Sequence, residues 1–219
     1  MAEEVVGKAL RTKRHDVFLC TKVFGTRFPA PNSVGLTRLN LIRGVDDSLK
    51  RLQTDYIDLY NLHGVVPQDY PYLVRDIYPE LQKAQEQGKI RFTGMSGHGG
   101  RLAECLGWGL DQDVLDVILV AYNFGQDPAF HQRFLSRFDF VALQPELPRV
   151  LERAKAKDVG VVAMKTLMGA RANDMRPYER EGGSCSQAAF RWVRANPNVD
   201  ALVISMNDSE KIDEYLGAS

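Results

Sequence analysis

Polar residues that can take part in chemistry close six apolar segments of this chain. They are Lys22, His63, Ser96, Asn123, Lys165 and Ser205. Histidine titrates near neutral pH, and α/β enzymes keep their active-site groups at the carboxyl ends of parallel strands. A lone histidine is more often a packed or solvent-facing side chain, but a sixfold recurrence favours a site. His63 and Lys22 are therefore predicted site residues.

A helix and a strand position His63. Apolar residues recur every three or four positions over 36–53, which predicts an amphipathic helix that Asn32 or Ser33 caps. The stretch 56–62 is short and rich in aromatic and β-branched residues, which predicts a strand that stops at His63.

The same alternation of helix and strand continues along the chain. Further strands are predicted at 17–20, 90–95, 114–120, 160–164 and 199–204, with helices at 3–10, 72–87, 101–108, 147–158, 184–195 and 208–216. Six strands that alternate with helices predict a parallel sheet, as in a TIM barrel or a doubly wound sheet. The Phe-rich stretch 124–147 has no period, which favours a packed lid.

Composition limits the classes of function. The 219 residues carry 28 basic and 28 acidic side chains, so the whole-chain charge gives no argument for a nucleic-acid or membrane partner. No apolar run approaches the roughly 18 residues of a membrane span. Cys20, Cys105 and Cys185 are widely separated, which argues against a metal cluster or a disulfide framework and favours reduced thiols in a cytoplasmic protein.

Two further motifs have more than one interpretation. The glycine-rich stretch SGHGG at 96–100 can cradle a phosphate at a helix start, but it does not match GxGxxG or a P-loop, and a flexible turn explains it equally well. The arginines of the loop 166–183, Arg171, Arg176 and Arg180, can clamp a phosphate or form a solvated charge run. No GxSxG nucleophile elbow is present, so hydrolase chemistry has no anchor.

Five segments resemble, in order and spacing, the aldo/keto reductases. They are Leu19–Lys22, SLKRLQTDYIDLYNLHG at 48–64, GKIRFTGMSGHG at 88–99, GVVAMKTLMGA at 160–170 and LVISMNDSEKIDEYLGA at 202–218. The resemblance covers nearly the whole chain. It implies a single domain over 1–219 with the fold of a (β/α)₈ TIM barrel, of which six βα units are present.

The resemblance also implies a reaction, a cofactor and a set of roles. The family transfers a hydride from NADP(H) to a small-molecule carbonyl substrate, and a tyrosine delivers the proton. Lys22 matches the lysine that lowers the pKa of that tyrosine, and His63 matches the histidine that polarises the carbonyl. Ser96 matches a residue that binds the nicotinamide carboxamide. Residues implied over the nicotinamide and pyrophosphate are Lys165 and Leu167, and those at the adenosine phosphate end are Ser205, Met206, Asn207, Lys211 and Glu214.

The aspartate and the tyrosine of the family's catalytic set have no matching position in this sequence. In the family they precede the part that this chain matches, so we expect an N-terminally incomplete barrel without its first two strands. Three interpretations stay open: an oxidoreductase of which this is a fragment, a catalytically inactive nucleotide-binding or scaffold protein, and a barrel segment that pairs its edges with another chain. The last predicts a homo-oligomer, or a poorly soluble chain, through the strands at 17–21 and 199–204.

Overall fold

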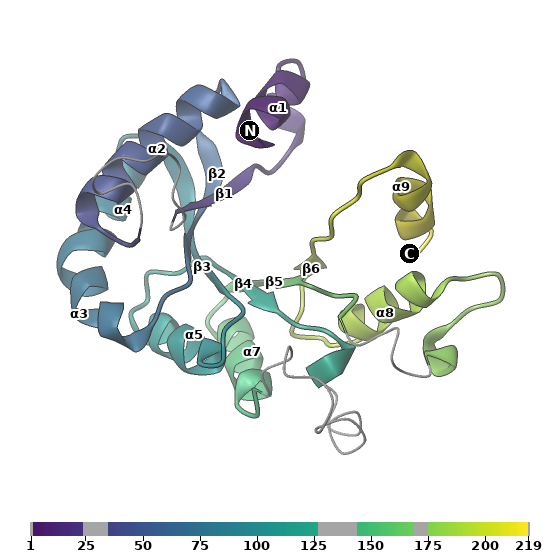
Figure 1. Cartoon of the computed structure of the whole chain (residues 1–219). Helices are drawn as coiled ribbons and strands as arrows, with labels where there is room; N and C mark the ends of the chain where they lie inside the picture. The colour runs from purple at the N-terminus through teal and green to yellow at the C-terminus, as the bar shows by residue number, and fades with distance from the viewer. Residues whose placement is uncertain (1, 24–34, 127–143, 169–174, 219) are drawn as a thin grey trace. The chain divides into compact units, whose positions relative to one another are not determined.

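A computed structural model describes residues 2–23, 35–126, 144–168 and 175–218. Six strands form one sheet in the order β1-β2-β3-β4-β5-β6, and the pairs β1–β2, β2–β3 and β5–β6 are parallel (Figure 1). The strands are β1 (Cys20–Val23), β2 (Ile57–His63), β3 (Ile90–Gly97), β4 (Val117–Ala121), β5 (Gly160–Met164) and β6 (Ala201–Leu202). The predicted parallel α/β sheet is therefore confirmed.

Helices precede and follow these strands as the periodicity predicts. They are α1 (Ala2–Leu10), α2 (Arg38–Leu52), α3 (Tyr70–Tyr72), α4 (Tyr78–Glu86), α5 (Leu102–Asp111), α7 (Leu147–Ala156), α8 (Cys185–Arg194) and α9 (Ser209–Leu216). The single helix predicted over 72–87 is instead α3, a π-helical turn at Leu73–Ile77 and α4 in succession. None of the described helices is both long and apolar enough to cross a membrane.

Three strand predictions were wrong in their bounds. Strand β4 covers Val117–Ala121 rather than 114–120. Strand β1 begins at Cys20 rather than at Val17, because its pairing with β2 starts where Cys20 faces Leu59. Phe18 lies before that pairing and is 58% exposed, so the run is not buried on both faces. Strand β6 has two residues, since only Val162 and Ala163 of β5 pair with it, and it does not extend over 199–204.

The start of α2 also differs from its prediction. Thr37 is the N-cap, and its side chain accepts a hydrogen bond from the backbone N–H of Asn40 at 3.2 Å. The predicted caps Asn32 and Ser33, like most of the predicted lid, lie outside the described residues. At the other end Gln53 adopts a left-handed conformation, with φ of 55°, which ends the helix where the sequence predicts.

The described chain divides into two compact units. The first comprises residues 1–96 and 108–117, and the second comprises 97–107 and 118–219. The single domain over 1–219 stays a prediction. In the first unit α1 lies against the end of α2, where a Cβ on the buried Gly7 would meet the carbonyl oxygen of Arg51 at 2.8 Å (Figure 1).

Three aspartates at the starts of β2, β4 and β6 accept a backbone hydrogen bond from the preceding strand or from the residue just before it. In the first unit the backbone N–H of Leu19 donates to the Asp58 carboxylate at 2.9 Å, and that of Thr93 donates to Asp116 at 2.7 Å. In the second unit the backbone N–H of Val161 donates to Asp200 at 2.8 Å. Asp58 lies in β2, whereas Asp116 and Asp200 directly precede β4 and β6. Each bond therefore fixes where one strand starts relative to the strand before it.

Asp58 is the most buried of the three and carries the most partners. Its side chain is 3% exposed and forms ion pairs with Arg14 at 2.9 Å and Arg91 at 3.0 Å. Burial alone would raise the pKa of Asp58, but the Leu19 N–H and the Arg14 and Arg91 guanidinium groups outweigh it and lower that pKa. The ionised carboxylate is therefore part of the folded state.

Asp58→Asn should lower the free energy of unfolding by about 1.5–3 kcal/mol, because it removes charge-assisted bonds and leaves Arg14 buried without its counter-ion. The folded pKa lies below the unfolded value of about 3.9, so the stabilisation is complete above that value and is lost as the pH falls through the folded pKa. Urea unfolding followed by circular dichroism should show a steeper loss of stability below about pH 4 in the parent than in the variant.

The exposed Asp55 supplies the control, since Asp55→Asn makes the same chemical change three residues earlier in the chain. Equal midpoints for the parent and Asp58→Asn, or parallel pH profiles, would contradict a role for this carboxylate in holding β1 to β2.

Candidate active site

Lys22, His63 and Ser96 lie on one face of the sheet at the carboxyl ends of β1, β2 and β3. Side chains alternate along a strand, so Cys20 shares a face with Lys22, and Asn61 shares a face with His63. The amide Nδ2 of Asn61 donates to the Cys20 sulfur at 3.0 Å, which places the two faces on the same side of the sheet. The first unit therefore brings together the two predicted catalytic residues and one predicted cofactor residue.

His63 is held by a direct contact with Ser96. The two residues are opposite one another in the parallel register, and His63 Nδ1 lies 2.8 Å from Ser96 Oγ. The backbone N–H of Gly64 donates to the carbonyl oxygen of Ser96 at 3.0 Å. Ser96 is 1% exposed, whereas His63 is partly exposed. The imidazole is thus anchored at one nitrogen to a buried hydroxyl while part of the ring remains open to solvent.

Lys22 supplies the positive charge on this face. It is exposed, and in the described part of the chain its ammonium group makes no hydrogen bond or ion pair. Lys22 lies opposite Asn61 in the β1–β2 pair. His63 is the next residue of β2 on the same face. An ammonium without a carboxylate partner, on the same face of the sheet as His63, favours the binding of a group that carries or develops negative charge.

Asn61 is a residue of this face that the sequence analysis missed. It is fully buried, and its Oδ1 has no hydrogen-bond partner. A signal was available, because an asparagine two residues before His63 must face the same way as His63. Gly94 of β3 leaves room for it: a Cβ at Gly94 would lie 2.8 Å from the carbonyl oxygen of Val117 and would overlap Asn61 Oδ1.

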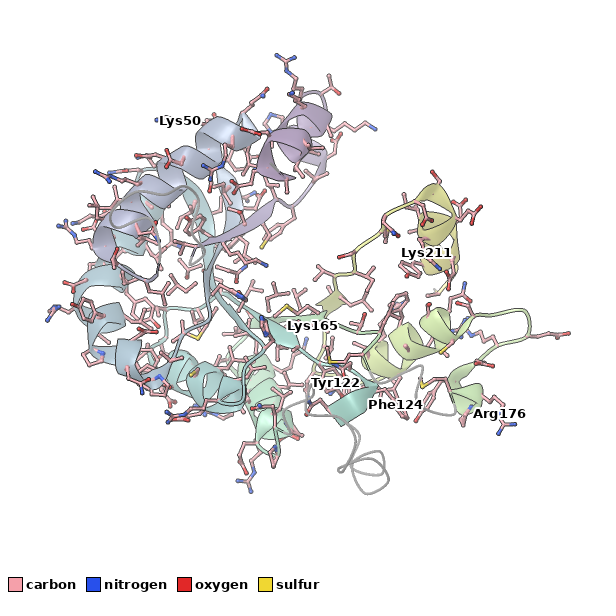
Figure 2. The ribbon with its side chains drawn as sticks, viewed as in Figure 1. Lys50, Tyr122, Phe124, Lys165, Arg176 and Lys211 are labelled. Carbon is pink, nitrogen blue, oxygen red and sulfur yellow. The ribbon has the colours of Figure 1, made fainter. Side chains whose placement is uncertain are left out.

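Two predicted cofactor residues lie after β5 in the second unit. Lys165 is exposed and has a φ of 58°, an unusual left-handed conformation for a residue with a side chain (Figure 2). Thr166 follows it, fully buried and with an unpaired Oγ1. Leu167 packs against the apolar cluster that contains Phe124 and Met175, so its observed contacts are those of a core residue.

The other predicted cofactor residues surround the start of α9 in the second unit. Ser205, Met206 and Asn207 are exposed. Asp208 caps the helix, because its carboxylate accepts the backbone N–H of Lys211 at 2.7 Å. The segment therefore presents a hydroxyl, an amide and a methionine to solvent directly before a helix N-terminus.

Lys211 and Glu214 form an ion pair on the first turns of α9. Lys211 Nζ lies 2.8 Å from Glu214 Oε2, and the Ser184 hydroxyl donates to Glu214 Oε1 at 2.6 Å (Figure 2 labels Lys211). The bonds from Lys211 and Ser184 lower the pKa of Glu214 to about 2, and the carboxylate raises the pKa of Lys211. Both groups are charged at neutral pH, and Ser184 ties the pair to the start of α8.

The glycine-rich stretch at 96–100 is held from within the protein. In the second unit the Gln144 amide donates to the carbonyl oxygens of Gly99 at 3.1 Å and Gly100 at 3.0 Å, and its Oε1 accepts the backbone N–H of Ala103. A side chain thus takes one of the donors at the start of α5 that a phosphate would need. These contacts favour the structural turn over the phosphate cradle.

Comparisons with known proteins identify what the chain is similar to. The model of the aldo/keto reductase family matches residues 1–219. A protein of Arabidopsis thaliana named as a probable voltage-gated potassium channel subunit beta is 42% identical over 244 residues, which cover 99% of this chain and 73% of that protein. The methylglyoxal reductase YeaE of Escherichia coli is 38% identical over 95 residues, 43% of this chain and 29% of that protein.

A solved structure has the same fold. The holo form of an aldo-keto reductase from Bacillus halodurans superposes with a TM-score of 0.72 at 21% identity, over 99% of this chain and 72% of that one. The six strands described here thus correspond to part of a (β/α)₈ barrel.

Gly94→Ala should disturb the face that carries His63, because the added methyl group collides with Asn61 Oδ1 and with backbone. We expect a loss of about 1–3 kcal/mol in unfolding free energy, the usual cost of overpacking. Gly99→Ala is the matched control, since nothing lies within 4 Å of a Cβ there. Denaturant midpoints that are the same for both variants would contradict the close approach of β3 to Asn61.

Proposed function

The chain belongs to the aldo/keto reductase family, and from this premise we propose that it is an NADP(H)-dependent oxidoreductase that reduces an aldehyde or a ketone to an alcohol. The observation that carries the proposal is the placement of His63 at the carboxyl end of β2, bonded through Nδ1 to the buried Ser96 and on the same face as Lys22. Family membership supports oxidoreductase chemistry, and the position of these residues on one face of the first unit supports the proposed site.

The reaction makes one C–H bond and one O–H bond. When bound, NADPH would supply a hydride to the carbonyl carbon and become NADP⁺, and water would supply the proton that the oxygen takes up. His63 is proposed to donate a hydrogen bond to the carbonyl oxygen and so to draw electrons from the carbon that accepts the hydride. Lys22 adds positive charge where the oxygen becomes negative; the tyrosine that a family lysine tunes has no matching position in this sequence, so the role proposed for Lys22 is electrostatic.

The cofactor residues that the family resemblance implies are proposed to keep those roles, each within its own unit. Ser96 would bind the nicotinamide carboxamide, and Lys165 would lie at the nicotinamide and pyrophosphate. The start of α9 fits the adenosine phosphate by its chemistry, because Ser205 and Asn207 expose a hydroxyl and an amide before the helix and Lys211 carries a partly exposed ammonium on its first turn. Met206 and Glu214 belong to the same stretch. Leu167 packs in the core, so we propose that it contacts the cofactor only through its backbone or the edge of its side chain.

The substrate and the location are proposed more broadly. Aldehydes and ketones are the class, and methylglyoxal is a suitable first probe because one relative bears the name methylglyoxal reductase. The channel role in the name of the potassium channel subunit beta is a statement about that relative and is not proposed for this chain. A cytoplasmic location is proposed from the cysteines, all three of which are free thiols.

Fluorescence titration should give a lower Kd for NADPH than for NADH, because an ammonium favours the additional phosphate. Lys211→Ala should weaken NADPH binding roughly 2- to 5-fold with little change for NADH, since the group is exposed and already shares its charge with Glu214. Lys50→Ala removes an exposed ammonium from α2 and is the control (Figure 2). Equal or tighter NADH binding by the parent would refute the NADP preference.

His63→Ala should lower kcat for carbonyl reduction by about 10²-fold, because the hydrogen bond to the oxygen strengthens in the transition state. NADPH binding should change less, and His15→Ala, which removes an exposed histidine, should leave both quantities as they are. Steady-state NADPH oxidation measures the effect, and an unchanged kcat in His63→Ala would return His63 to a structural role.

A further inference from the structure

The direction of the hydrogen bond between Ser96 and His63 determines which nitrogen of His63 carries the hydrogen. The Ser96 hydroxyl can donate one hydrogen and accept at its lone pairs, and a neutral imidazole has one nitrogen of each kind. With Nδ1 and Oγ 2.8 Å apart, either the hydroxyl donates to Nδ1 or the Nδ1–H group donates to the hydroxyl. The two directions give different tautomers of His63, and they differ in what they leave unsatisfied.

Burial decides between the two directions. Ser96 is 1% exposed, and among residues 2–23, 35–126, 144–168 and 175–218 its hydroxyl has no partner other than His63. If Nδ1–H donated to the hydroxyl, the hydroxyl hydrogen would be buried without an acceptor, which costs about 1–3 kcal/mol. If the hydroxyl donates to Nδ1, that hydrogen is satisfied.

We propose that Ser96 is a positioning residue that donates its hydroxyl hydrogen to Nδ1 and thereby holds neutral His63 as the Nε2–H tautomer. Nε2 then carries the hydrogen of the neutral ring. The tautomer follows from the contact and the burial of Ser96 alone, and only its use in carbonyl reduction rests on the proposed function.

The same assignment limits what Ser96 can do for a nicotinamide. Its single hydrogen is committed to His63, so only lone pairs of Oγ remain. Ser96 can therefore accept a hydrogen bond from the N–H of a carboxamide but cannot donate to its oxygen. A substitution at Ser96 would thus disturb the imidazole before any cofactor binds.

The tautomer can be measured directly in the chain without cofactor. Long-range ¹H–¹⁵N NMR correlations of a sample labelled in its four histidines distinguish Nε2–H from Nδ1–H rings, and His63→Gln identifies the His63 signals. At about pH 8.5 we expect the neutral form of His63 to be wholly the Nε2–H tautomer. An Nδ1–H ring in the parent protein would overturn the proposal without any further variant.

Ser96→Ala tests whether the serine is the cause. The pattern of His63 should change to a mixture of the two tautomers, while Ser48→Ala, which removes another buried hydroxyl in the first unit, should leave it as in the parent. Far-ultraviolet circular dichroism confirms that both variants fold. An unchanged His63 pattern in folded Ser96→Ala would also overturn the proposal.

The outcome is separate from that of the proposed function. An Nε2–H ring that depends on Ser96, in a chain that reduces no carbonyl compound, would support the positioning role and refute the reaction. Carbonyl reduction by a chain whose His63 is the Nδ1–H tautomer would support the reaction and refute the positioning role of Ser96.

Discussion

A carboxylate at the start of one strand that accepts a backbone N–H of the preceding strand, or of the residue just before it, is the constraint on which this structure depends. Asp58, Asp116 and Asp200 each make that bond, at β1–β2, at β3–β4 and at β5–β6. In a parallel sheet a one-residue slip moves every side chain to the other face. Fixing the strand starts therefore also fixes which residues are level at the strand ends, where the candidate site lies.

The candidate site shows the consequence of that register. His63 and Ser96 can meet at 2.8 Å only because β2 and β3 are aligned from Ile57 and Ile90 to their carboxyl ends. The close approach of the strands at Gly94 leaves space for Asn61 beneath His63. The imidazole thus has a fixed place on rigid strands, which is the condition for a catalytic group that acts through its hydrogen-bond geometry.

Association of the chain through β1 and β6, the outer strands of the sheet, stays a prediction.

Much of this could be predicted from the sequence because the signals are local. The 3.6-residue period of α2 and the apolar runs of β2 and β5 depend on neighbouring residues, and they are where the sequence places them. The strand edges could not be predicted in the same way. Val17 and Phe18 are as apolar as a strand, but pairing begins only where a partner strand is present, at Cys20.

The site shows the same division between local and nonlocal signals. That His63 and Lys22 end strands follows from local patterns, whereas the bond from His63 to Ser96 joins residues 33 positions apart and depends on the register. The ion pairs of Asp58 with Arg14 and Arg91 depend on it too, and a sequence pattern does not encode such distances. Ser96 was assigned to the cofactor from resemblance, and its contact with the histidine emerged only from the fold.

Isotope transfer tests the central claim of carbonyl reduction most directly. The chain is incubated with methylglyoxal and NADPH that carries deuterium at the transferable position of nicotinamide C4, and the alcohol formed is analysed by mass spectrometry. Hydride transfer predicts one deuterium on the carbon that bore the carbonyl oxygen, and His63→Ala should reduce its amount. Alcohol without deuterium, or no alcohol from a chain that binds NADPH across a panel of aldehydes and ketones, would contradict the account.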